Sequence, residues 1–570
     1  MSKKLAVISL LCVAMFGTSS CSFLSGFLGG NDSQKESSDE QSNSEQAGSS
    51  VEENKEVTFK SVYGGDELVL AAGEKKTLQV NQDISGNEYI KIVLESDVNL
   101  YGEYKYSDIK NAEHVVVEPF YIEPSNEEIV FKQFFDAFRP NAIGAFDKQL
   151  ISISLTNLDA VPANVKIKDV SVANRVIPEF EKEIYLEKGG LKIGADLAMG
   201  GTLSYLEKTS YEAADGETYT VDEVINQKGE ICIGVNAQQG AKETLSSSVN
   251  LINICDAGRE FQQSYYADIG GSTEEATGAN GYDRRWSFTA TREGYYWPYN
   301  PVQGGDEVCN LAQIIDYEVT KNSIYVKVRA MDWGNGYARP EYASHENHEA
   351  QKYGRTTKSY MENVYTIKGG MLYVDNRFID WNGFTDMEEI PYHTLEIPAA
   401  YVVHPLHNYV CYTGSSPWDL ADTAYDRQPN LPGWWDENAH VNANHPEDWF
   451  AWVNDDDFGV GVYIPNADHY ISGRNNPQRH TENENNNNAK KSKMATEYLY
   501  NKKAPTSDYT SCYVGNTSYT APVVHVRMEE YVPISYTYVI AVDYVPVMRA
   551  AFSGMSITNE GLDAWDRLEV

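Results

Sequence analysis

The stretch Ile324-Tyr325-Val326-Lys327-Val328-Arg329 alternates apolar and polar residues without interruption. A period of two is the pattern of a β-strand that buries one face, because successive side chains point to opposite sides of a sheet. The same alternation recurs at Val523-Val524-His525-Val526-Arg527. Clusters of Gly, Asn and Asp separate these runs from further strand-like segments. The sequence therefore predicts an all-β protein. One stretch is open between helix and strand, because Ser125 and Glu128 have capping-box spacing before an apolar run.

Composition limits the classes of partner. The chain has 570 residues and a formal net charge of -37. A protein this acidic repels phosphate backbones, so we expect no nucleic-acid partner. The 40 Tyr, 18 Phe and 10 Trp favour strands and surfaces that stack on sugar rings.

The first residues have the pattern of an export signal. Lys3 and Lys4 precede a short apolar run, and small residues lead to Cys21. This order resembles a bacterial lipoprotein signal, which implies that residues 1–20 are removed and that Cys21 is lipidated. Residues 21–57 are rich in Ser, Glu and Asn and predict a disordered tether. We expect a lipid-anchored protein on the extracellular face of the cell membrane.

We expect two folded units on either side of 178–187. Residues 58–177 have the length and strand pattern of a β-sandwich like a small carbohydrate-binding module. Residues 187–570 predict a large antiparallel β domain. The odd number of Cys residues after Cys21, with no CxxC spacing, indicates neither a disulfide framework nor a zinc site.

The larger unit opens with a recognisable order of short motifs. Leu191-Lys192-Ile193-Gly194 leads into Gly200-Gly201-Thr202-Leu203, and Asp256-Ala257-Gly258-Arg259 follows later. This order resembles the opening of the galactose-mutarotase-like β-supersandwich. The resemblance implies a supersandwich-like fold and a sugar as the class of ligand. It carries over no catalytic residue, because no local motif matches one.

The candidate site lies where the Trp residues gather, since nine of the 10 lie between Trp286 and Trp452. Planar polar side chains and rigid aromatic loops suit sugar recognition, because they fork hydrogen bonds to hydroxyls and stack on sugar rings. The residues that we expect to bind substrate are Arg259, Gln263, Tyr266, Arg284, Arg285, Trp297, Asn300, Gln303, Arg377 and Trp434.

The candidate catalytic residues are Glu396, His393, Asp332 and Asp436. Pro391 and Pro398 indicate an irregular segment from which His393 and Glu396 could reach one cleft. Glycoside hydrolysis would pair Glu396 with Asp332 or Asp436. Lyase elimination would need a base, His393 or a Tyr, and a group that neutralises a uronate, for which the candidates are Arg284, Arg285 and Arg377. We expect a polysaccharide-cleaving enzyme; the alternatives are a non-catalytic glycan-binding lipoprotein and a structural envelope protein. Asn454-Asp455-Asp456-Asp457 is a turn that could hold structural Ca²⁺.

Overall fold

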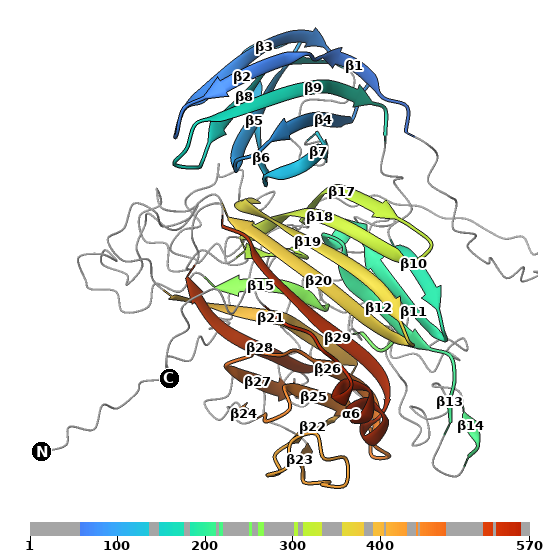
Figure 1. The fold of residues 1–570 in the computed structure, drawn as a ribbon. Helices are drawn as coiled ribbons and strands as arrows, with labels where there is room; N and C mark the ends of the chain where they lie inside the picture. Colours follow the sequence, from blue (N-terminus) through green and yellow to red (C-terminus); the bar gives the residue numbers. More distant parts are fainter. Residues whose placement is uncertain are drawn as a thin grey trace, which may run out of the picture.

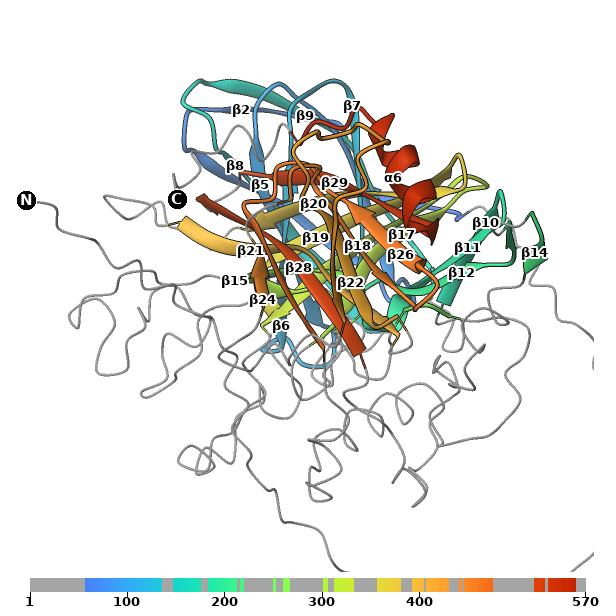
Figure 2. The ribbon, with the colours of Figure 1, turned by 90° about the horizontal axis from the view of Figure 1, so that it is seen from below.

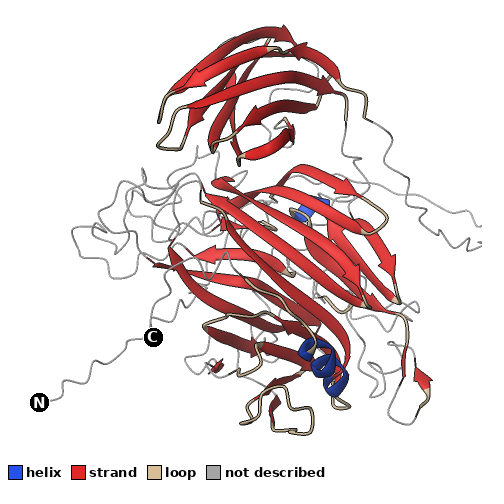
Figure 3. Ribbon diagram, in the orientation of Figure 1, coloured by secondary structure: helices blue, strands red, loops and turns tan. Residues whose placement is uncertain are grey.

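The computed structural model describes residues 57–135, 147–175, 183–212, 216–219, 250–252, 260–266, 301–305, 312–332, 356–380, 392–403, 406–429, 440–442, 445–474, 517–527 and 532–559. Strands account for nearly all of the regular structure within these ranges, as Figure 3 shows. The all-β class is confirmed. The stretch from Ser125, open between helix and strand in the sequence, is a strand.

The N-terminal part is an antiparallel β-sandwich of two sheets (Figure 1). One sheet has the order β1-β9-β4-β7 with β2 added to β9, and the other has the order β3-β8-β5-β6. The core between them includes Ile92, Tyr104, Phe120 and Ile153. We call this sandwich the module. Its strands are β1 (Lys60–Tyr63), β2 (Asp66–Leu70), β3 (Lys75–Asp83), β4 (Tyr89–Ser96), β5 (Leu100–Asp108), β6 (Val115–Ile122), β7 (Ser125–Phe134), β8 (Lys148–Asn157) and β9 (Ala163–Ala173).

The second part begins with a small sheet, β10-β11-β12, and a two-stranded ribbon, β13-β14. Their bounds are β10 (Glu183–Lys188), β11 (Leu191–Asp196), β12 (Thr202–Lys208), β13 (Tyr211–Glu212) and β14 (Thr218–Tyr219), with a short 3-10 helix η1 (Leu197–Met199). Gly200 and Gly201 turn the chain from η1 into β12 at φ values of 61° and 69°. A Cβ on Gly201 would lie 2.7 Å from the Val326 side chain, so only glycine allows this approach.

The main sheet has the order β23-β22-β25-β26-β29-β20-β19-β18-β16-β15-β21-β28-β27-β24, with β17 added to β18. Its first half is β15 (Gln262–Tyr266), β16 (Pro301–Val302), β17 (Gln313–Val319), β18 (Ser323–Asp332), β19 (Thr356–Lys368), β20 (Met371–Asp380) and β21 (Tyr392–Val403). The remaining strands are β22 (Asn408–Tyr412), β23 (Tyr425–Pro429), β24 (His440–Asn442), β25 (Trp449–Val453), β26 (Phe458–Tyr463), β27 (His469–Arg474), β28 (Thr517–Arg527) and β29 (Ile534–Tyr544).

This sheet encloses a large apolar core. Val326 from β18, Leu395 from β21 and Val524 from β28 all belong to one buried cluster. The sheet therefore folds back so that its two halves pack against each other. Both Trp449 and Trp452 are fully buried, so these two members of the Trp-rich window are structural. We refer to the buried cluster that contains Val326, Leu395 and Val524 as the main core.

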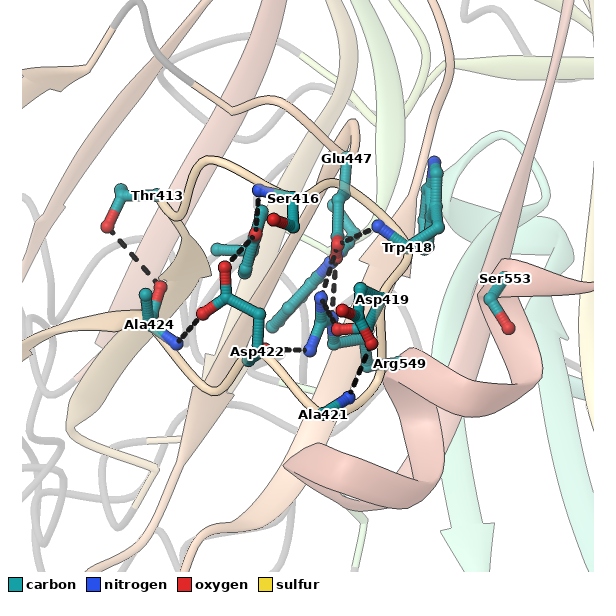
Figure 4. A network of polar contacts seen from close by, with 12 residues as sticks. Thr413, Ser416, Trp418, Asp419, Ala421, Asp422, Ala424, Glu447, Arg549 and Ser553 are labelled. Carbon is teal, nitrogen blue, oxygen red and sulfur yellow. Dashed lines mark hydrogen bonds and ion pairs between the residues drawn. The ribbon is translucent and has the colours of Figure 1, made fainter.

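Helix α6 (Val545–Ser553) follows β29 directly and packs beside β26 (Figure 2). Arg549 of α6 is buried and forms the centre of a polar network with Glu447 (Figure 4). The network ties the chain before β23 to the helix, because Arg549 also donates to the carbonyl oxygens of Asp419 and Asp422. Among the described residues, no helix is long and apolar enough to cross a membrane.

The module rests on the polar face of β18, β19 and β20 (Figure 1). Tyr121 of the module packs with Ile315, Tyr360 and Ile379 of the large domain. Arg329 donates to Glu118 at 2.7 Å, and both side chains are largely buried. The alternation in β18 thus buries both faces of the strand, one in the main core and one under the module.

Candidate functional site

Several predicted site residues lie outside the described ranges. They are Cys21, Arg259, Arg284, Arg285, Trp297, Asn300, Trp434 and Asp436. Three others, Tyr266 in β15, Asp332 in β18 and His393 in β21, are described as strand positions. The four whose surroundings are described are Gln263, Gln303, Arg377 and Glu396.

Glu396 lies in β21 on the face that is turned away from the main core. Its neighbours Leu395 and Ile397 point into that core, and strand alternation turns Glu396 to the other side. The Glu396 carboxylate accepts a 2.7 Å hydrogen bond from the hydroxyl of Tyr519, and 7% of Glu396 is exposed. The Tyr519 ring in turn packs against Tyr401, with ring centroids 4.5 Å apart. Glu396 is therefore a nearly buried carboxyl held in a fixed position.

The strand register brings further polar positions to this face. Ser264 pairs with Glu396 and Tyr266 with Thr394, so Tyr266 occupies the same side two residues along. On the opposite neighbour, Thr394 pairs with His525 and Glu396 with Val523. We call the positions of Tyr266, Thr394, Glu396, Tyr519 and His525 the Glu396 face. The positions of Tyr266 and Glu396, which the sequence analysis singled out separately, both belong to it.

The segment around His393 is not irregular, which corrects the expectation drawn from Pro391 and Pro398. β21 pairs with both β15 and β28, and a bulge lies between Glu396 and Ala400. Pairing is regular from Tyr392 to Glu396, where His393 aligns with Val526. An odd separation along a regular strand gives these two positions opposite faces. Pairing on both sides evidently outweighs the local preference of the prolines.

The side chains of Gln263 and Gln303 form hydrogen bonds with other parts of the protein. Gln263 donates from Nε2 to the Glu362 carbonyl oxygen at 2.9 Å and to Asn363 Oδ1 at 3.1 Å. Gln303 donates to the Gly200 carbonyl oxygen at 3.0 Å and accepts from the Gln263 backbone N–H. Both side chains are fully buried. This geometry supports a structural role for these two amides, between the halves of the sheet and at the glycine turn.

Arg377 lies under the module. Its Nη1 is 2.8 Å from Glu123 of the module, and its Nε is 3.5 Å from Glu362 on β19. Phe378 beside it belongs to the main core, so Arg377 points away from that core on the β18–β20 side. Arg377 and Glu396 are therefore on opposite sides of the main core.

The acidic turn forms no metal site within the described residues. Asn454 Oδ1 accepts backbone N–H groups from Asp456 and Phe458, which closes a turn between β25 and β26. Asp455 pairs with His407, and Asp457 pairs with Arg427. No group of three or more His, Cys, Asp or Glu side chains that could hold a metal ion occurs in the described ranges.

Sequence reasoning missed Tyr519, Lys327 and Glu362. Tyr519 is 123 residues from Glu396 in the chain, and no local pattern links them. Lys327 and Glu362 occupy the polar positions of alternating strands, which are typical of a solvent-facing surface. The sequence contained one indication of this face: Tyr325, Lys327 and Arg329 place an aromatic ring and two positive charges on the same side of one strand.

Comparison with known proteins gives distant similarities only. No protein-family model matches the sequence, and no curated protein matches it. A family 29 carbohydrate-binding module complexed with cellulohexaose is 14% identical over 20% of this chain and 75% of that one, at a TM-score of 0.14. A putative aldose 1-epimerase from Escherichia coli K12 is 9% identical over 64% of this chain and 99% of that one, at 0.27. The 4-alpha-glucanotransferase from Thermococcus litoralis is 9% identical over 64% of this chain and 39% of that one, at a TM-score of 0.25. These similarities concern the fold alone.

Proposed function

We propose that this protein cleaves a polysaccharide at the Glu396 face, with Glu396 as a proton-transferring or nucleophilic carboxyl. The observation that carries the proposal is the hydrogen bond of Tyr519 to the nearly buried Glu396 carboxylate. Catalytic carboxyls of glycan-cleaving enzymes need a fixed position and a partly desolvated environment. Glu396 has both, and Tyr266 and His525 occupy the same face.

Two chemistries remain open for this face. Hydrolysis needs a second carboxyl across the scissile bond, and the proposed partners are Asp332 and Asp436. Elimination needs a base and a cation beside a uronate carboxylate; the proposed base on this face is a tyrosine, because the position of His393 lies on the opposite face of β21. Arg284 and Arg285 are the proposed cations. Arg377 is separated from this face by the main core and would act independently of Glu396.

The second candidate function is glycan binding without cleavage. The partly exposed ring of Tyr401, which packs against the buried Tyr519, favours it, because a tyrosine on a sheet face can stack on a sugar ring. In that case Glu396 would accept hydrogen bonds from sugar hydroxyls and transfer no proton. The proposed location is the same for both functions: the outer face of a bacterial membrane, through a lipid on Cys21.

The experiment is a pair of Glu→Gln substitutions assayed on polysaccharides. E396Q removes the candidate carboxyl, and E207Q is the matched control, because Glu207 is also buried and accepts a tyrosine hydroxyl, from Tyr205 at 2.6 Å. We expect E396Q to lose activity by at least about 100-fold, and E207Q to keep it. Equal activities would contradict the catalytic role. Cleavage lost with binding retained in E396Q would separate catalysis from recognition.

The anchor is tested separately with Cys21→Ala. We expect the unsubstituted protein to fractionate with membranes and the variant to appear in the soluble or secreted fraction, because one lipid-bearing residue carries the attachment. Membrane association that is equal in both forms would contradict the proposed anchor without touching the role of Glu396.

A further inference from the structure

The junction between the module and the large domain contains a cavity of about 510 Å³. Its walls come from β6 and β7 of the module and from β17, β18, β19 and β20 of the large domain. This volume falls within the range of roughly 300–1,000 Å³ that small-molecule sites have. Lys132 and Glu318 lie at its rim, 3.9 Å apart and partly exposed, so the cavity reaches solvent.

Lys327 of β18 lines this cavity with a nearly buried ammonium group. Its side chain is 7% exposed, and its closest carboxylate oxygen, Glu362 Oε1, is 4.0 Å away. Among the described residues, Nζ makes no hydrogen bond; it lies 4.1 Å from the ring centre of Tyr360 and 5.0 Å from that of Phe131. A buried ammonium without hydrogen bonds is costly. Its three N–H donors are available to a molecule in the cavity.

Two carboxylates of the cavity are already engaged, whereas two of its cations keep N–H donors without hydrogen bonds. Glu362 Oε1 accepts the Tyr325 hydroxyl at 2.6 Å, and Glu123 pairs with Arg377. Arg377 Nε is buried and makes no hydrogen bond in the described part of the chain, although Glu362 is 3.5 Å away. Lys327 and Arg377 thus both present unused N–H groups. A ligand that complements them must supply acceptor oxygens.

The charge of the lining decides between charged and neutral oxygens. Five carboxylates line the cavity and only three cations, the carboxylates being Glu123, Glu128, Asp316, Glu318 and Glu362 and the cations Lys132, Lys327 and Arg377. An anionic ligand would therefore enter a site with excess negative charge. Neutral hydroxyl and ring oxygens avoid this repulsion, and the rings of Tyr121, Phe131 and Tyr360 offer apolar contact to sugar CH groups.

We propose that this junction cavity binds one residue of a neutral glycan, with Lys327 and Arg377 donating to its hydroxyl oxygens. The site is separate from the Glu396 face, because Val326 beside Lys327 and Leu395 beside Glu396 both point into the main core between them. The proposal draws its ligand class from the cavity lining, so it can fail while the function proposed for Glu396 stands.

The test is calorimetric titration of the full protein with neutral oligosaccharides of glucose, mannose, galactose and xylose. Lys327→Met removes the ammonium and keeps the aliphatic stem, and Lys110→Met is the control on an exposed side chain. We expect K327M to bind at least about tenfold more weakly, since a hydrogen bond to a charged group contributes more than that factor. K110M should keep this binding.

The folding of K327M is checked by its melting temperature, which we expect to be equal or higher, because a desolvated charge is lost. Three results would overturn the proposal: no neutral oligosaccharide binds, K327M binds as tightly as the unsubstituted protein, or a uronate oligosaccharide binds more tightly at Lys327 than the neutral ones. Ordered water alone in the cavity of soaked crystals would also overturn it.

Discussion

The Arg549 guanidinium and the Glu447 carboxylate form two parallel hydrogen bonds, Nε to Oε2 at 2.8 Å and Nη2 to Oε1 at 2.6 Å. Both side chains are 1% exposed. Trp449 Nε1 and the Trp418 backbone N–H donate to the same carboxylate, at 2.7 and 2.5 Å. The pair therefore joins α6 to β25 and to the segment before β23 (Figure 4).

Breaking this pair should be costly. We expect Glu447→Gln to lower the free energy of unfolding by about 3 kcal/mol, because it leaves a buried guanidinium without its counter-charge. The control is Asp457→Asn, which breaks the exposed ion pair with Arg427 and should cost less than about 1 kcal/mol. Urea denaturation followed by tryptophan fluorescence measures both. Equal losses in the two variants would contradict a structural role for the buried pair.

The glycine turn before β12 allows a second stability test. Gly201→Ala combines a positive φ of 69° with a Cβ placed 2.7 Å from Val326. Gly369→Ala has a φ of 59° but meets nothing within 4 Å. We expect G369A to lower the free energy of unfolding by about 1 kcal/mol through backbone strain alone. G201A should lower it by at least about 2 kcal/mol more, because its Cβ clashes in the main core. Indistinguishable melting temperatures would show that β18 does not pack against this turn.

Asp316 makes the module junction sensitive to pH. It accepts hydrogen bonds from the Tyr89 hydroxyl and from Arg175 Nη1, both of the N-terminal part. Burial raises the pKa of Asp316 to about 6 despite these partners. Because the folded-state pKa is raised, the folded state binds more protons than the unfolded state between about pH 4 and pH 6. The contribution of protonated Asp316 to the stability of the folded state is therefore complete below about pH 4 and is lost as the pH rises through 6.

The substitution Asp316→Asn removes this titration. We expect the unsubstituted protein to lose on the order of 2 kcal/mol between about pH 4 and pH 7 through this residue, and D316N to show a flatter profile. Unfolding free energies measured across this range provide the comparison. Parallel profiles for the two proteins would mean that Asp316 does not titrate in the folded junction.

The β18 alternation shows how far sequence reasoning extends. Ile324, Val326 and Val328 correctly predicted a strand with one face in the core. The pattern could not predict that Lys327 is buried and Arg329 mostly covered, because the sequence of a polar strand face is the same under solvent and under a docked module. The partner of Arg329 is Glu118, 211 residues away in the other unit. Such a pair depends on the docking of two units, which no local spacing encodes.

The candidate site was predictable to a similar extent. Glu396 was predicted as a catalytic carboxyl from its spacing to His393, and the structure places it beside Tyr519 and in register with Ser264, on the opposite face from the position of His393. Gln263 and Gln303 have the chemistry of sugar ligands, yet at their positions their amides bridge β19 and the glycine turn. Residue type alone cannot separate these roles, because a buried amide satisfies protein and sugar partners with the same atoms.

The most direct test of the central claim is a cleavage assay of the protein on a panel of neutral and acidic polysaccharides. It follows new reducing ends together with the ultraviolet absorbance of unsaturated products. The account predicts new reducing ends that depend on Glu396, with absorbance if the chemistry is elimination and without it if the chemistry is hydrolysis. No cleavage and no retardation in polysaccharide-containing gels would contradict it.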